Sequence, residues 1–174
     1  MSDFITDLYG VLPHLSFDPR LEEVPVSTTT LTSLNASGAR VLHKKSQLSP
    51  SADLLFRALS LVFFSPYASH ASSPPWRSAA FAKRLLTSAL QFPPASALRS
   101  LDFVKQLLVR EPKVEALLCS DDRTADGVYR ADVDDPQVSN PFAGSFYELA
   151  LLESRHWDER VRAEAARLTR YTGQ

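Results

Sequence analysis

SPSADLLFRALSLVFF, residues 49–64, decides the fold class of this chain. Ser49 is a favoured residue just before a helix, and Pro50 suits the first helical position, so a helix is predicted to begin here. The apolar residues that follow leave only a narrow polar stripe of Asp53, Arg57 and Ser60. A helix that is apolar around most of its circumference is typically buried by several neighbours. We therefore expect it to be the central element of an all-helical fold.

Prolines mark the starts of three further helices, at residues 74–75, 93–94 and 112. The spacing in the first of these predicts Trp76, Ala79, Ala82, Leu85, Leu86 and Ala89 inward and Arg77, Arg84, Ser88 and Gln91 outward. Helices joined by short turns predict stacked antiparallel helix pairs, the end of a HEAT- or armadillo-like α-solenoid. Because the sequence shows no clean internal repeat, a closed irregular bundle stays open as an alternative.

The first fifty residues differ from the rest. Apolar residues between Phe4 and Leu12 have helical spacing, and Pro13 is expected to end that helix. Residues 16–49 are rich in Ser, Thr, Pro and Asn, which predicts a long flexible connection, unordered between about residues 20 and 48. We therefore divide the chain into an N-terminal helix with its connection, residues 1–50, and a C-terminal helical domain, residues 51–174. If the solenoid continues upstream, the first helix would expose an apolar face with Phe4, Ile5 and Leu8.

A long acidic loop is predicted between residues 120 and 143, which carry six aspartates against two arginines. Asp126-Gly127 is a tight-turn signal that would support a small hairpin. A merely flexible loop would not need its five large apolar or proline residues, so we expect an ordered strap against the helices. These residues are Val128, Tyr129, Val133, Pro136 and Phe142. Asp134 and Asp135 would then face Lys83, Arg84 or the arginines of the last helix, whereas the alternative is a solvated acidic loop.

Two cap signals lie near the C-terminus. Ser145 followed by Glu148 matches a capping box, in which each side chain bonds the backbone of the other. Asp158 is predicted to cap the last helix, whose arginines would form a solvated face. Trp157 stands between these two helices and is expected to lock their corner rather than to lie exposed.

Composition excludes several functions. A net charge of −1 with a pI near 6.4 argues against a nucleic-acid-binding surface on this chain. The single Cys119 permits no internal disulfide and fits a reducing compartment, and no apolar run is long enough to span a membrane. The histidines lack metal-ligand spacing, a calcium loop fails at Pro136 and Gln137, and Gly144-Ser145 lacks the second glycine of a nucleophile elbow. We therefore expect an interaction module with no catalytic residues, metal or cofactor.

An ordered series of motifs carries a family resemblance. It comprises AAFAKRL (79–85), DDR (121–123), GVY (127–129), DDP (134–136), SNP (139–141), FYELALL (146–152) and HW (156–157). Over residues 52–171 the chain resembles the CCAAT-binding factor domain family of nucleolar complex-associated proteins. The candidate interaction motif taken from this resemblance is Tyr129, Asp134, Asp135, Asn140, Phe146, Glu148, His156 and Trp157.

The resemblance implies a function that the residues alone do not. It implies a non-enzymatic scaffold for maturation and export of the large ribosomal subunit precursor, located in the nucleolus and so the nucleus. The implied partners are nucleolar complex-associated protein two, as a heterodimer, and the pre-ribosomal particle. Ribosomal RNA or chromatin would be contacted through other parts of the full-length protein, and a role in DNA replication initiation is also implied. The alternative is a generic helical-repeat adaptor with no link to ribosomes.

Overall fold

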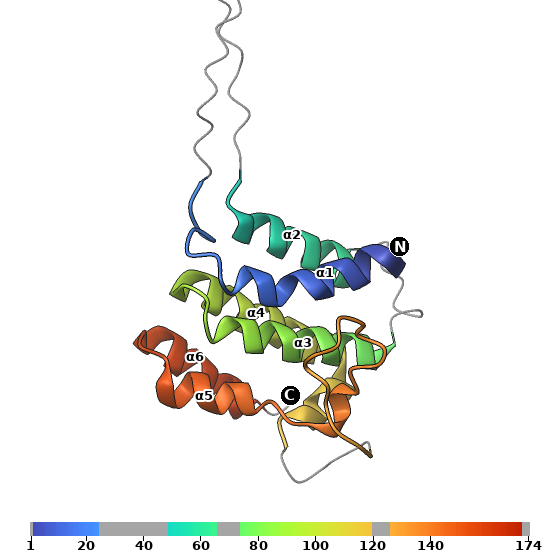
Figure 1. Cartoon of the computed structure of the whole chain (residues 1–174). Coiled ribbons are helices and arrows are strands. Elements are labelled where there is room, and N and C mark those ends of the chain that lie inside the picture. Colours follow the sequence, from blue (N-terminus) through green and yellow to red (C-terminus); the bar gives the residue numbers. More distant parts are fainter. Residues whose placement is uncertain (1, 25–48, 66–73, 120–125, 172–174) are drawn as a thin grey trace, which may run out of the picture.

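The chain forms an all-helical fold, as predicted (Figure 1). The computed structural model describes residues 2–24, 49–65, 74–119 and 126–171. The α-helices are α1 (Ser2–Leu15), α2 (Ser51–Phe63), α3 (Pro75–Ala89), α4 (Pro94–Arg110), α5 (Tyr147–Arg155) and α6 (Glu159–Thr169). Two 3₁₀ helices, η1 (Pro112–Leu117) and η2 (Pro141–Ala143), lie between α4 and α5. No strand occurs among the described residues, so the segment that follows Asp126-Gly127 does not form the strand of a hairpin, and residues 120–125 before the turn lie outside the described part.

The helices stack in three layers: α1 with α2, α3 with α4, and α5 with α6 (Figure 1). Contacts between layers run from α1 to α3 to α5 in one row, and from α2 to α4 to α6 in the other. Within each layer the two helices run in opposite directions (Figure 1). The prediction of stacked antiparallel helix pairs in a solenoid-like arrangement is thus confirmed.

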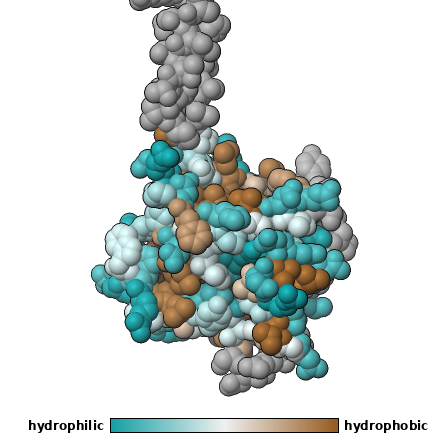
Figure 2. Space-filling view, in the orientation of Figure 1, coloured by the Kyte–Doolittle hydropathy of each residue, from teal (hydrophilic) through white to brown (hydrophobic). Residues whose placement is uncertain are grey.

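Helix α3, in the middle layer, is the most deeply buried element. Eleven of its 15 residues are buried, including Arg84 and Ser88, which were predicted to face outward. The predicted central role of α2 is wrong, because its Leu54 and Leu61 are 57% and 68% exposed. Figure 2 shows apolar surface among the hydrophilic side chains at the level of α1 and α2, which form an outer layer. A middle layer is covered on both sides, whereas an outer layer is covered on one.

Helix α1 continues through Pro13 to Leu15, beyond its predicted end. Its buried residues are Leu8, Tyr9 and Leu12, which join the same hydrophobic core as α3. The predicted exposed face of Phe4, Ile5 and Leu8 is therefore wrong at Leu8, which packs inward. Half of the Phe4 side chain remains exposed.

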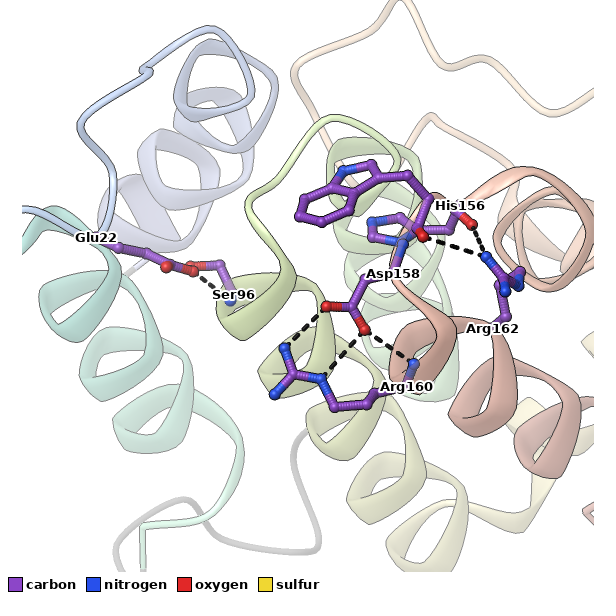
Figure 3. A network of polar contacts seen from close by, with 7 residues as sticks. Glu22, Ser96, His156, Asp158, Arg160 and Arg162 are labelled. Carbon is purple, nitrogen blue, oxygen red and sulfur yellow. Dashed lines mark hydrogen bonds and ion pairs between the residues drawn. The ribbon is translucent and has the colours of Figure 1, made fainter.

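The segment after α1 is ordered further than expected. Leu21 is fully buried, and its carbonyl oxygen accepts a hydrogen bond from Ala52 N, at the start of α2. Glu22 Oε1 accepts hydrogen bonds from Ser96 N at 2.6 Å and Ser96 Oγ at 2.8 Å, at the start of α4 (Figure 3). The expectation of an unordered stretch from about residue 20 is wrong for these residues. The rest of the predicted connection, residues 25–48, lies outside the described residues, and the division of the chain after residue 50 stays a proposal.

Candidate interaction site

Lys83 of α3 anchors a buried polar cluster that joins three parts of the chain. Its Nζ donates to Ser145 O at 2.5 Å and lies 3.2 Å from Glu148 Oε1, in the first turn of α5. The ammonium also lies over two aromatic rings, 4.6 Å from the centre of Tyr129 and 4.8 Å from that of Tyr147. Neither Lys83 nor Glu148 exposes any side-chain surface. Because each charge is out of water, it depends on the other.

Burial perturbs both partners of this pair. Loss of hydration lowers the pKa of Lys83, and the facing Glu148 carboxylate offsets part of that change. Loss of hydration likewise raises the pKa of Glu148, with Lys83 as the main opposing influence. Thr87 Oγ1 supplies one more hydrogen bond to Glu148 Oε1, at 3.2 Å. Shifted pKa values occur in structural ion pairs as well as in catalytic sites. This pair is enclosed, which fits a structural role.

Arg84, the next residue of α3, holds the acidic loop. Its Nη1 donates to Val133 O and its Nη2 to Asp134 Oδ1, each at 2.5 Å. The guanidinium lies over the Tyr9 ring of α1, 4.2 Å from the ring centre. Arg84 therefore connects α1, α3 and the loop. The predicted contact of Asp134 with Arg84 is confirmed, whereas Lys83 pairs with Glu148 instead.

The described part of the acidic loop, residues 126–143, is an ordered strap closed upon itself. Asn140 Nδ2 donates to Asp126 O at 2.9 Å, and Arg130 N donates to Ser139 O at 2.8 Å. Asn140 adopts a left-handed backbone conformation with a φ of 49°, which asparagine tolerates better than most residues. Gly127 has a φ of 102°, which favours glycine. These bonds close the neck of the loop.

Side chains of the strap divide between the core and solvent. Pro136 and Ser139 are buried and Phe142 packs partly against the core, as expected of a strap. The predicted burial of Val128 is wrong, because its side chain is 77% exposed. Asp135 accepts a hydrogen bond from Gln137 N within its own turn, so it does not reach the basic residues of α3. Residues 120–125 lie outside the described part of the chain.

The predicted capping box at Ser145 and Glu148 is wrong. Helix α5 begins after Phe146, and in the described structure no side chain caps it. Glu148 points into the core toward Lys83, because a buried ammonium is a stronger partner for a carboxylate than a neutral backbone amide. Phe146 itself is buried, and its N–H donates to Leu117 O at 2.6 Å.

His156 and Trp157 form a separate corner, beyond the C-terminal end of α5. The buried His156 accepts a hydrogen bond at Nδ1 from Asp158 N, and Arg162 Nη1 donates to His156 O at 2.8 Å. Trp157 stacks on His156, with ring centres 5.8 Å apart and planes 16° from parallel. The prediction that Trp157 locks the corner is wrong, because its side chain is 75% exposed. Asp158 caps α6 through Arg160 N, as predicted.

The structure thus gathers three of the eight motif residues at α3: Tyr129, Asp134 and Glu148. Of the partners that contact them, Lys83 and Arg84 were predicted only as residues that the acidic loop would face, and Thr87 and Tyr9 were not predicted. A side-by-side Lys-Arg pair inside the otherwise apolar run AAFAKRLL was the available signal. Among the described residues no group of three His, Cys, Asp or Glu side chains could hold a metal ion, and no helix could cross a membrane.

A sequence profile of the CBF/Mak21 family matches residues 1–165, which is nearly the whole chain. The chain belongs to the CBF/Mak21 family. The match reaches residue 1, so the family region is longer than the motifs at residues 52–171 indicated.

Individual relatives agree with this assignment. The chain is 30% identical over 156 residues to Nucleolar complex-associated protein 3 of Saccharomyces cerevisiae, covering 90% of the chain. It is 35% identical over 96 residues to the Schizosaccharomyces pombe protein of the same name, covering 55% of the chain. It is 38% identical over 92 residues to Nucleolar complex protein 3 homolog of Danio rerio, covering 53%. The chain spans 22%, 13% and 11% of these relatives' lengths, respectively. Their names support a nucleolar, and hence nuclear, localisation.

Proposed function

We propose that this chain is part of a non-enzymatic scaffold that acts in ribosome biogenesis, in maturation and export of the large-subunit precursor. The observation that carries the proposal is the CBF/Mak21 match over residues 1–165, together with relatives named as nucleolar complex proteins. In keeping with the family resemblance, we propose nucleolar complex-associated protein two and the pre-ribosomal particle as partners of the full-length protein.

The geometry supports a scaffold. Two adjacent residues of the middle helix, Lys83 and Arg84, whose own side chains are buried or nearly so, connect α1, the strap and α5. A body fixed in this way presents its surfaces in constant relative positions, which an assembly factor needs. The replication role implied by the resemblance has no supporting feature among the described residues, and we leave it out of the proposal.

Co-purification tests this function. The full-length protein would be tagged in its own cells and purified, and the bound RNA sequenced alongside mass spectrometry of the bound proteins. We expect large-subunit precursor rRNA and nucleolar complex-associated protein two to be enriched over an untagged control. Glu148→Lys, which places a second cation against Lys83, should abolish the enrichment, whereas Glu23→Lys at an exposed position should not. Enrichment of membrane-transport or signalling proteins without precursor rRNA would instead indicate the generic adaptor.

A further inference from the structure

The outer face of α6 presents arginines whose carboxylate partners lie deeper. Arg160, Arg167 and Arg170 are 72%, 77% and 75% exposed at their side chains. Their partners Asp158, Glu164 and Glu153 are only 11%, 26% and 38% exposed. Because each guanidinium is the outer member of its pair, an approaching molecule meets positive charge first.

An exposed aromatic ring lies at the N-terminal end of the helix that carries these arginines. Trp157 lies two residues before α6, and its ring stacks with an offset on that of His156, with 5.8 Å between the ring centres. The corner is fixed, because Arg162 Nη1 donates to both His156 O and Trp157 O, at 2.8 and 3.2 Å. The near-parallel stack can be extended outward by one more planar ring. A rigid, exposed tryptophan of this kind provides a platform for a nucleic-acid base.

The overall charge of the chain conceals this surface. The segment 120–143 holds six aspartates and two arginines, so its own charge is more negative than the −1 of the whole chain. The remainder of the chain therefore carries a net positive charge. Around α6, five arginines stand against four carboxylates, of which Glu159 is exposed and the other three are the partly buried partners Glu153, Asp158 and Glu164. The net charge of the whole chain therefore does not exclude nucleic-acid contact at this face.

We propose that Trp157 and the arginines Arg160, Arg167 and Arg170 form a contact surface for single-stranded RNA. An unpaired base stacks on the free face of Trp157, and phosphates lie against the arginine row. An unpaired strand is favoured over a duplex because the bases of a duplex already stack on one another. The surface is argued from charge and geometry alone, whereas the choice of RNA over DNA rests on the proposed function.

Fluorescence anisotropy with a labelled uridine dodecamer at low salt tests the surface. Trp157→Ala should weaken binding about 5- to 100-fold, the range for losing one stacked base. Replacing both Arg167 and Arg170 by Gln should reduce the slope of log affinity against log salt by about 0.7 per arginine. Arg130→Gln and Arg99→Gln remove exposed, ion-paired arginines elsewhere and should leave both quantities unchanged. Equal losses in these controls, or wild-type binding by Trp157→Ala, would overturn the proposal.

Two further experiments, one on tryptophan fluorescence and one on competition, identify the ligand. In a Trp76→Phe background Trp157 is the remaining tryptophan, and its fluorescence should be quenched on RNA binding. Unchanged fluorescence at saturation would rule out stacking and so overturn the surface. A polyglutamate peptide that competes as well as RNA would assign the surface to an acidic protein segment instead, and tighter binding of single-stranded DNA would overturn the choice of RNA. These outcomes do not depend on co-purification with pre-ribosomes, so failure of the surface and failure of the proposed function are distinguishable.

Discussion

Lys83 Nζ of α3 and Glu148 Oε1 of α5 lie 3.2 Å apart with no exposed side-chain surface on either residue. These residues are 65 positions apart in the sequence, and their contact joins the middle layer of helices to the last one. A buried ion pair contributes little net stability, because desolvation of both charges offsets their attraction. Loss of one partner is costly, however, because the other charge stays buried.

This asymmetry gives the first prediction. Glu148→Met and Lys83→Met should each lower the free energy of unfolding by about 3–5 kcal/mol, the range for leaving one buried charge unpaired. The double variant with Met at both positions should recover most of that loss. Urea unfolding of the four proteins provides the cycle, and a double variant as unstable as the sum of the singles would contradict the pairing.

Tyr129 is predicted to stabilise the strap through its ring and not through its hydroxyl. The ring lies under Lys83, and the buried hydroxyl has no hydrogen-bond partner among the described residues. Tyr129→Ala should cost about 2–4 kcal/mol, as for other large-to-small replacements in a core, while Tyr129→Phe should cost close to nothing. Denaturant midpoints measure both. A midpoint for Tyr129→Ala equal to that of the wild type would mean that the strap is only a tether.

Asp134 and Asp135 are adjacent but should differ in effect. Asp134 pairs with the nearly buried Arg84, although its own side chain is 69% exposed, so we expect Asp134→Asn to cost about 1 kcal/mol. That cost should shrink when salt screens the pair. Asp135→Asn keeps an acceptor for Gln137 N and should be close to neutral. Thermal unfolding at low and high salt compares them, and equal losses would contradict the geometry.

Glu22 should stabilise α4 from a distance along the chain. Its carboxylate accepts hydrogen bonds at Ser96, where the cap residue Pro93 offers no side-chain acceptor. Glu22→Ala should cost about 1 kcal/mol, as for loss of a helix cap, and speed amide hydrogen exchange at the start of α4. The exposed neighbour Glu23 provides a matched control. Glu23→Ala should change neither the free energy of unfolding nor the exchange rate at the start of α4. Unchanged exchange at Ser96 in Glu22→Ala would refute the long-range cap.

The cap of α6 should depend on pH. The hydrogen bond from the Arg160 side chain holds the pKa of Asp158 at about 2, below its ordinary 3.8. As pH falls, the unfolded chain therefore takes up this proton before the folded chain does. The stability that the charge provides is present above pH 3.8 and is lost as pH falls toward about 2. Asp158→Asn keeps the cap but removes the charge, so the difference in urea midpoint from wild type should disappear over that window.

The sequence by itself determined the helices, most of their starts and the family. Proline and cap signals depend only on neighbouring residues, so α3, α4 and η1 begin where prolines predict, α4 ends at Arg110 before Pro112, and Asp158 caps α6. The motif series from AAFAKRL to HW identified the CBF/Mak21 family without any structure.

Tertiary structure alone decided which helix is central and which residues the buried charges pair with. The polar stripe of a helix faces solvent only when one side is free. Layers cover α3 on both sides, so Lys83 and Arg84 are enclosed and must find partners far along the chain. Hydrophobic periodicity records the polarity of a face and not what covers it, and for that reason α2 was taken for the central helix. The role of Glu148 also depends on the stacked layers, because only they bring the buried ammonium of Lys83 within 3.2 Å of its carboxylate. A local capping box could not compete with that contact.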